Sequence, residues 1–246
     1  MSDTKIAMLT AVWGRPELTR MMLEYYEEMP IDELYGVFGF DDPDECNYDS
    51  DRWDWWGREN SPLSNKWQSG IDYIRALQSY DGHKSDIDAV MIMGSDDFVS
   101  PQYIEACKGL IASGVDYIYM DGAYFYDTVS GRMMWAHAEK LGLGRCISAR
   151  LLDRMDWQLW PAGMENGLDG AMDDKIRAMT GAHAVCLKDA RKRGLYGMDV
   201  KTDQNLWSYD HIRNNLLFSD INAEKVLPKL FPTISDKLLT FKREAV

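Results

Sequence analysis

Apolar residues in the first half of the chain follow two spacings, one typical of buried strands and the other of amphipathic helices. Uninterrupted apolar runs predict four buried strands, at residues 5–12, 34–40, 87–93 and 115–120. Apolar residues three or four positions apart predict helices between these strands, starting near residues 16, 67 and 101. Strands and helices that alternate in this way form a mostly parallel sheet with helices on both faces.

The pattern weakens after Gly122, where the chain becomes rich in aromatic residues and glycine. Two short helices are predicted there, near residues 149–155 and 170–179. A chain of 246 residues falls within the range of one domain, and it contains no internal repeat or obvious linker. We therefore predict a single α/β domain, residues 1–246, whose two lobes meet near Gly122.

Acidic residues outnumber basic ones, and the formal net charge is −13. Such a charge repels nucleic acid backbones and anionic membranes at long range, so binding to either needs a local basic groove. The cysteines, Cys46, Cys107, Cys146 and Cys186, lack the spacing of a zinc or redox motif, which favours free thiols in a reducing compartment. No signal peptide or membrane-spanning run is recognisable. These features predict a cytoplasmic protein that does not insert into a membrane.

The sharpest chemical signal lies at residues 90–97, where an apolar strand runs into two adjacent carboxylates, Asp96 and Asp97. In open α/β sheets, ligands bind at the carboxyl ends of the strands. Carboxylate oxygens there suit Mg²⁺ or Mn²⁺, which can neutralise the charge of a departing diphosphate. The alternative is that both aspartates only shape the turn before Pro101.

Three segments, in order along the chain, carry a resemblance to a known family: residues 6–16 (IAMLTAVWGRP), residues 65–71 (NKWQSGI) and Ser95-Asp96-Asp97. They are similar to the opening strand and turn, a helix start and the Asp-X-Asp motif of the GT-A glycosyltransferases. The chain resembles the family-2-like members, phage-encoded ones in particular, over most of its length. The resemblance implies a GT-A fold, a Rossmann-like and mostly parallel sheet flanked by helices. It also implies a nucleotide-binding half at 1–121 and a half for the donor sugar and the acceptor at 122–246.

Members of that family move a sugar from a nucleotide-sugar donor to an acceptor hydroxyl, and we expect the donor here to be a UDP-sugar. The resemblance implies that Asp97 holds Mn²⁺ or Mg²⁺ on the diphosphate and that Asp96 approaches the ribose. It also implies further contacts to the nucleotide sugar: Thr10, Val12, Arg15, Lys66, Ser95 and Lys201. Asp41 is a candidate base or ribose contact, in the segment that replaces the usual Asp-Asp-Gly-Ser turn.

A candidate general base and a late metal ligand lie in the second half. Residues 142–148 resemble the family's small-residue segment near the donor sugar, and Asp169 follows where members supply an acidic base. Asp169 would deprotonate the acceptor in an inverting transfer; alternatively it only caps the helix predicted at 170–179. His211, or else Asp203, stands where GT-A enzymes often take a late metal ligand, although a lone histidine is often structural.

The acidic segment at residues 41–64, which contains Trp53, Trp55 and Trp56, is predicted to be a long functional loop. Its indoles can stack on a sugar or base of the acceptor, or can form a small satellite core. The likeness to phage-encoded members suggests a hydroxymethylated pyrimidine in viral DNA, or a glycan on it, as the acceptor, and the host cytoplasm as the location. Two basic clusters can hold the phosphates or be solvated helix faces: Arg145, Arg150 and Arg154, or Lys188, Arg191, Lys192 and Arg193.

Two other functions are compatible with these patterns. A nucleotidyltransferase also places metal-binding carboxylates on an α/β sheet, but it should have a glycine-rich basic loop after the first strand. The turn Trp13-Gly14-Arg15-Pro16 lacks such a loop, which ranks this function second. A non-catalytic sugar- or base-binding module would use the tryptophans and would not need Asp97 and Asp169 together.

Overall fold

The structure, a computed structural model, describes residues 4–40, 50–78, 87–138, 141–205 and 207–241; Asp41 of the predicted site lies outside them. Its larger sheet has seven strands, in the spatial order β10 (Ala184–Leu187), β6 (Tyr117–Met120), β9 (Arg145–Ser148), β4 (Ala89–Gly94), β1 (Ile6–Ala11), β2 (Glu33–Gly39) and β3 (Trp53–Arg58). Only β9 runs antiparallel to its neighbours, so the sheet is mostly parallel, as predicted.

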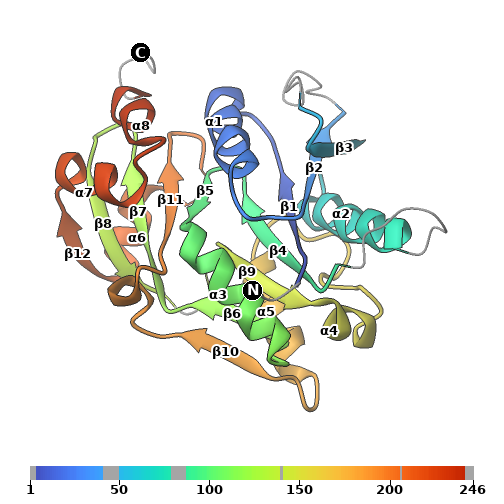
Figure 1. Ribbon diagram of the computed structural model, residues 1–246. Helices are drawn as coiled ribbons and strands as arrows, with labels where there is room; N and C mark the ends of the chain where they lie inside the picture. The colour runs from blue at the N-terminus through green and yellow to red at the C-terminus, as the bar shows by residue number, and fades with distance from the viewer. Residues whose placement is uncertain (1–3, 41–49, 79–86, 139–140, 206, 242–246) are drawn as a thin grey trace.

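Eight α-helices occur in the described part of the chain: α1 (Pro16–Glu27), α2 (Leu63–Gln78), α3 (Pro101–Ala112), α4 (Ala149–Arg154), α5 (Leu168–Ala178), α6 (Tyr209–Asn215), α7 (Ala223–Leu230) and α8 (Ser235–Phe241). Figure 1 shows α6, α7 and α8 gathered on one side of the molecule and α2 beside β2 and β3 on the other. The predicted helices near residues 16, 67, 101, 149 and 170 are all confirmed.

Side chains of the central strands alternate between two hydrophobic cores. On β1, Ile6 and Met8 share one core with residues of α1 and α3. Ala7 and Leu9 belong to the other core, together with residues of α2, α4 and α5. Successive side chains of a strand point to opposite faces, so helices cover both faces of the larger sheet and the predicted α/β class is confirmed.

A second sheet, which the sequence pattern did not predict, has five strands in the order β12 (Leu217–Ile221), β8 (Met133–His137), β7 (Gly122–Asp127), β11 (Gly197–Lys201) and β5 (Asp97–Val99). β5 comes from the first half of the chain, and β9 and β10 from the second half join the larger sheet. The two sheets therefore interleave segments from both halves, and a functional division at residue 121 stays a prediction.

The prediction of a long loop at residues 41–64 is wrong for the described part of that segment, because residues 53–58 form the edge strand β3. β3 pairs in parallel with β2, and Trp55 stacks on Trp53 with ring centroids 5.5 Å apart. The Trp55 ring fills the place that a Cβ at Gly36 of β2 would occupy. Aromatic side chains favour strands, and this preference outweighed the acidic residues around them.

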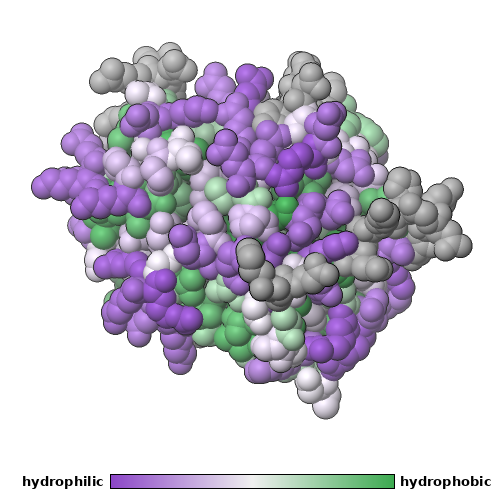
Figure 2. Space-filling view, in the orientation of Figure 1, coloured by the Kyte–Doolittle hydropathy of each residue, from purple (hydrophilic) through white to green (hydrophobic). Residues whose placement is uncertain are grey.

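Hydrophilic side chains cover most of the face of the molecule seen in Figure 2, and hydrophobic residues are visible only in small areas between them. Within the described ranges, no helix has both the length and the apolar character needed to cross a membrane.

Candidate active site

The adjacent aspartates predicted from the sequence lie at the carboxyl end of β4. The backbone N–H of Gly94 donates to Oδ2 of Asp97 over 2.8 Å, which folds the carboxylate back over the strand end. Only glycine fits here, because a Cβ on Gly94 would lie 2.8 Å from Oδ2 of Asp97 and 2.9 Å from Oδ1 of Asp96. Both aspartates are largely buried. The chain thus delivers two carboxylates to the edge where ligands bind in α/β sheets.

Strand pairing adds a third carboxylate. Asp97 opens β5, which runs antiparallel to β11, and Asp199 of β11 lies directly opposite it. Val200 N–H donates to the Asp96 carbonyl over 2.9 Å and fixes this register. Asp96, Asp97 and Asp199, hereafter the carboxylate cluster, each place one oxygen within 4.8 Å of the others.

Two cations and an amide hold the carboxylate cluster in place. Arg15 lies just after β1, and its guanidinium contacts Oδ2 of Asp96 over 2.5 Å. The side-chain amide of Asn205 donates to the same oxygen over 2.6 Å. Nζ of Lys201, two residues along β11 and on the same face as Asp199, lies 2.7 Å from Oδ2 of that aspartate. With all three carboxyls ionised, three negative charges meet two positive ones, and the site has an excess of negative charge.

The three carboxyls differ in pKa. Burial raises the pKa of Asp97 well above its usual range, and repulsion from Asp199 and Asp96 adds to the rise. Burial also raises the pKa of Asp199, to about 6, against the attraction of Lys201. Burial acts on Asp96 in the same direction, but Arg15 and Lys201 outweigh it and lower the pKa of that carboxyl. Asp97 and Asp199 are the groups that an added positive charge would stabilise most.

The carboxylate cluster fits a hard divalent cation. Its donors are carboxylate oxygens, which Mg²⁺ and Mn²⁺ prefer. Oδ1 of Asp199 is buried and has no hydrogen-bond partner among the described residues, although a buried acceptor normally has one. A cation at the cluster would satisfy this oxygen and offset the excess negative charge.

Asp169 lies in the first turn of α5 and does not cap the helix, because Gly167 occupies the N-cap position. The residue is exposed, yet the surrounding protein desolvates its carboxyl and raises the pKa, against the attraction of Arg145 and Lys201. The carboxyl oxygens of Asp169 contact Gly142 so closely that a Cβ there would overlap them. The carboxyl of Asp169 can accept a proton within the electrostatic range of Lys201.

Three of the residues predicted to bind the nucleotide sugar have internal roles. Thr10 and Val12 are fully buried, and Nζ of Lys66 donates to the Val12 carbonyl over 2.6 Å and to Oδ1 of Asn60 over 2.5 Å. Lys66 thereby ties α2 to the end of β1. Ser95 accepts a bond from Arg15 over 3.0 Å, beside the carboxylate cluster. Whether any of these groups contacts a nucleotide stays a prediction.

His211, the predicted late metal ligand, is an exposed residue of α6 whose ring lies against Trp207 with centroids 5.1 Å apart. It does not belong to the three-residue group that can hold a metal among the described residues. Asp203 is exposed in the turn after β11. The metal role of either residue stays a prediction.

Sequence reasoning missed Asp199, Asn205 and the internal role of Arg145. Asp199 and Lys201 alternate with the buried Met198 and Val200, so the strand pattern placed both polar residues on one face. Arg145 is fully buried and donates to the carbonyls of Leu141 and Asp169 over 2.6 and 2.7 Å. Arg145 therefore ties the two ends of residues 141–169 together.

The first predicted basic cluster is committed to internal contacts. Besides the buried Arg145, Arg150 lies 2.6 Å from Oδ1 of Asp116, and Arg154 donates to the Thr180 carbonyl. In the second cluster, Arg191 lies over the rings of Tyr124 and Trp135.

No protein-family model matches this chain, and no curated protein matches its sequence. Its fold is nevertheless similar to that of solved structures. A 4-diphosphocytidyl-2C-methyl-D-erythritol synthase is 12% identical and has a TM-score of 0.50, covering 78% of this chain and 92% of its own. A synthase of the same name from Anaerococcus prevotii DSM 20548 is 11% identical, with a TM-score of 0.46 and coverages of 74% and 87%. Rv0371c from Mycobacterium tuberculosis H37Rv, solved in complex with manganese, is 13% identical, with a TM-score of 0.45 and coverages of 86% and 97%.

At such low identity the likeness shows the fold alone. The chain has the α/β fold of the first synthase, a mostly parallel sheet flanked by helices, which confirms the predicted fold class. Glycosyl transfer, a UDP-sugar donor and a phage origin do not follow from it.

Proposed function

We propose that this protein is a divalent-metal-dependent transferase that acts on a nucleotide substrate at the carboxylate cluster. The observation that carries the proposal is the convergence of Asp96, Asp97 and Asp199 within 4.8 Å at the carboxyl end of β4. Similar edges of α/β sheets bind nucleotides, and oxygen ligands there suit the cations that accompany phosphates.

The three aspartates would hold the metal, and the cations around them would hold the aspartates. A bound Mg²⁺ or Mn²⁺ supplies charge neutralisation for phosphate oxygens and for the departing phosphate group. Arg15 keeps Asp96 ionised and fixes its orientation. Lys201 does the same for Asp199 and adds positive charge where substrate phosphates would lie.

Nucleotidyl transfer is the reaction we favour. In it, an oxygen of the acceptor attacks the α-phosphorus of a nucleoside triphosphate, and pyrophosphate leaves with the electrons of the broken P–O bond. The neighbour with the TM-score of 0.50 is named for a product in which a diphosphocytidyl group is joined to methylerythritol. This fold-level analogy supports the reaction type and says nothing of the acceptor used by this chain.

Glycosyl transfer is the second candidate, and Asp169 favours it. Its accessible carboxyl with a raised pKa is suited to take the proton of an acceptor hydroxyl as the hydroxyl attacks the anomeric carbon and a nucleoside diphosphate leaves. The turn Trp13-Gly14-Arg15-Pro16 also lacks the glycine-rich basic loop expected for nucleotidyl transfer. A hydroxymethylated pyrimidine or a glycan on viral DNA is then the acceptor class to test first.

The released product separates the two reactions. The protein is incubated with Mn²⁺ and either nucleoside triphosphates plus sugar phosphates or nucleotide sugars plus hydroxymethylated DNA, and the products are identified by mass spectrometry. Pyrophosphate release that survives Asp169→Asn supports nucleotidyl transfer. Nucleoside diphosphate release that falls by about 10²–10⁴-fold in Asp169→Asn supports glycosyl transfer. Turnover that is unchanged in Asp97→Asn, or no turnover of any donor, overturns the proposal.

A further inference from the structure

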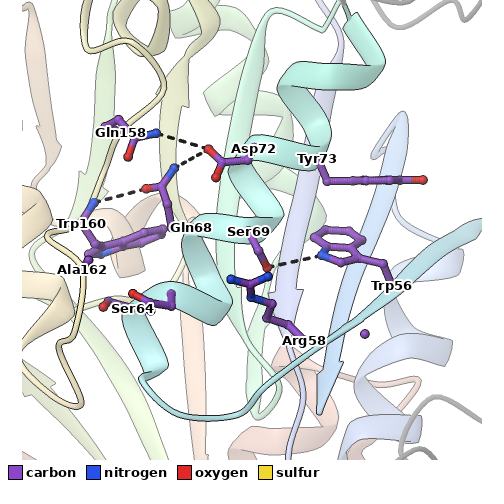
Figure 3. A pocket seen from close by; sticks show the side chains of 12 residues that line it. Trp56, Arg58, Ser64, Gln68, Ser69, Asp72, Tyr73, Gln158, Trp160 and Ala162 are labelled. Carbon is purple, nitrogen blue, oxygen red and sulfur yellow. Dashed lines mark hydrogen bonds between the residues drawn. The ribbon is translucent and has the colours of Figure 1, made fainter. Parts of the chain in front are cut away.

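A groove separate from the carboxylate cluster runs along the outer face of α2. It has a volume of about 630 Å³ and lies between β3, α2 and residues 158–162. Pockets that bind small ligands have volumes of roughly 300–1,000 Å³. Figure 3 shows Trp56 and Tyr73 at one end, Gln158 and Trp160 at the other, and polar side chains of α2 between them.

The two faces of α2 serve different sites. Lys66 and Gly70 face the sheet: Lys66 bonds the end of β1, and a Cβ at Gly70 would press on Leu9. Gln68 and Asp72 line the groove on the opposite side, one helical turn apart. No member of the carboxylate cluster is among the residues that line the groove.

An aromatic surface is already assembled at one end of the groove. The rings of Trp56 and Tyr73 are stacked with centroids 4.3 Å apart and planes inclined by 25°. Nε1 of Trp56 donates to Oγ of Ser69 over 3.4 Å, and the Tyr73 hydroxyl donates to Asp54 over 2.8 Å. Both rings are half-buried, so their orientation is set before any ligand arrives.

Planar polar groups line the middle of the groove and are also fixed in advance. Nε2 of Gln68 donates to Oδ1 of Asp72 over 2.9 Å and to the Trp157 carbonyl over 2.8 Å. Nε2 of Gln158 donates to the same oxygen of Asp72 over 3.3 Å. Asp72 and Gln158 are exposed, and their remaining oxygens, Oδ2 and Oε1, can accept bonds from a ligand.

The charges of the groove balance. Arg58 and Asp72 both line it, and each carries one charge of opposite sign. A groove with one positive and one negative group, in a protein of net charge −13, does not select an anionic or a cationic ligand. It favours a neutral molecule that has both donors and acceptors.

We propose that this groove binds a neutral saccharide. A sugar ring has an apolar C–H face for Trp56 and hydroxyls around its rim, each able to donate to Asp72 or Gln158 and to accept from Arg58. A nucleobase also stacks on indole, but its polar atoms lie on limited edges and do not match acceptors and donors spread along the helix. The inference stands whichever reaction the carboxylate cluster performs.

Ligand-observed NMR and calorimetry test the proposal directly. The full chain is titrated with glucose, galactose, mannose, N-acetylglucosamine, maltose, cellobiose and lactose, and in parallel with uridine and adenosine. At least one saccharide should bind with a millimolar dissociation constant, equally in Mn²⁺ and in chelator. Asp72→Ala and Gln158→Ala, both at exposed positions, should each weaken binding about tenfold or more.

Trp56→Ala removes packing against Tyr73 as well as the stacking surface, so its folding is checked by circular dichroism and the two polar variants carry the test. Glu105→Ala replaces an exposed acidic residue of α3, far along the chain, and should leave binding unchanged. The proposal is overturned if no saccharide binds, if only the nucleosides bind, or if binding survives both polar variants.

Discussion

Replacing Asp97 by asparagine should make the metal-free protein more stable while removing its response to divalent metal. Asparagine has nearly the same shape, and its side-chain oxygen can still accept the bond from the Gly94 amide. When Asp97 is ionised, Asp96 and Asp199 repel its charge, and the neutral asparagine removes this repulsion. When Asp97 is protonated, the asparagine removes the need to bind that proton. Asp97, which the proposal makes a metal ligand, therefore lowers the stability of the protein without metal.

The size of the effect follows from the distances in the carboxylate cluster. Unit charges 4.8 Å apart repel by about 3 kcal/mol at an effective dielectric constant of ~20. The Gly94 amide and Lys201 offset part of this energy. We expect the free energy of unfolding to rise by about 1–2 kcal/mol at neutral pH, which for a domain of this size raises Tm by about 3–6 °C.

The increase in the free energy of unfolding of Asp97→Asn should depend on pH. Both Asp97 and Asp199 have raised pKa values in the folded state, about 6 for Asp199. A carboxyl whose pKa is higher in the folded than in the unfolded state stabilises the fold fully below its unfolded-state pKa, which is near 4. This stabilisation is lost as the pH rises through the folded-state pKa. The stability difference between variant and wild type should thus be small near pH 4 and widen as the pH rises above about 5.

Calorimetric unfolding of both proteins in chelator and in Mn²⁺ measures these effects. Manganese at about 100 times its dissociation constant should stabilise the wild type by about 2.7 kcal/mol and the variant by far less. Asp173→Asn is the matched control, because Asp173 is fully buried but lies 2.7 Å from Arg177, so its loss should destabilise. The reasoning is refuted if Asp97→Asn is less stable than the wild type in chelator at pH 7.5, or if Mn²⁺ stabilises both equally.

Three further predictions test the site and its support. Gly94→Ala places a Cβ against both carboxylates and should weaken Mn²⁺ binding about tenfold or more by calorimetry, whereas Gly109→Ala, in open space on α3, should not. Manganese affinity should fall as the pH drops through about 6, where Asp199 takes up a proton, and titrations at pH 5 and 7.5 check this. Lys66→Met leaves the carbonyl at the end of β1 without its donor and should lower the urea-unfolding free energy by about 1–3 kcal/mol.

Four strands of the larger sheet, β1, β2, β4 and β6, were predictable because they are buried on both faces, whereas β9 and β10 were not predicted. Strands such as β1 and β4 are almost entirely apolar, and their length and spacing from amphipathic helices distinguish them from helices. β3 was not predicted because it is an edge strand in which three tryptophans stand beside Asp54, Gly57 and Arg58, close to an acidic segment. The five-stranded sheet was not predicted for another reason. Its strands come from distant parts of the chain, and pairing between such strands has no local sequence signature.

The candidate site also combines residues that the sequence predicted with one that it did not. Asp96 and Asp97 were predictable because they are adjacent at the end of a buried strand, whereas Asp199 joins them only through the antiparallel pairing of β5 and β11. A shift of one residue in that register would turn Asp199 to the opposite face of β11 and leave two carboxylates in place of three. The burial of Met198 and Val200 opposes such a shift, because it would bring both side chains out of the core. The convergence of the three carboxylates is therefore a consequence of apolar packing on the far side of one short strand.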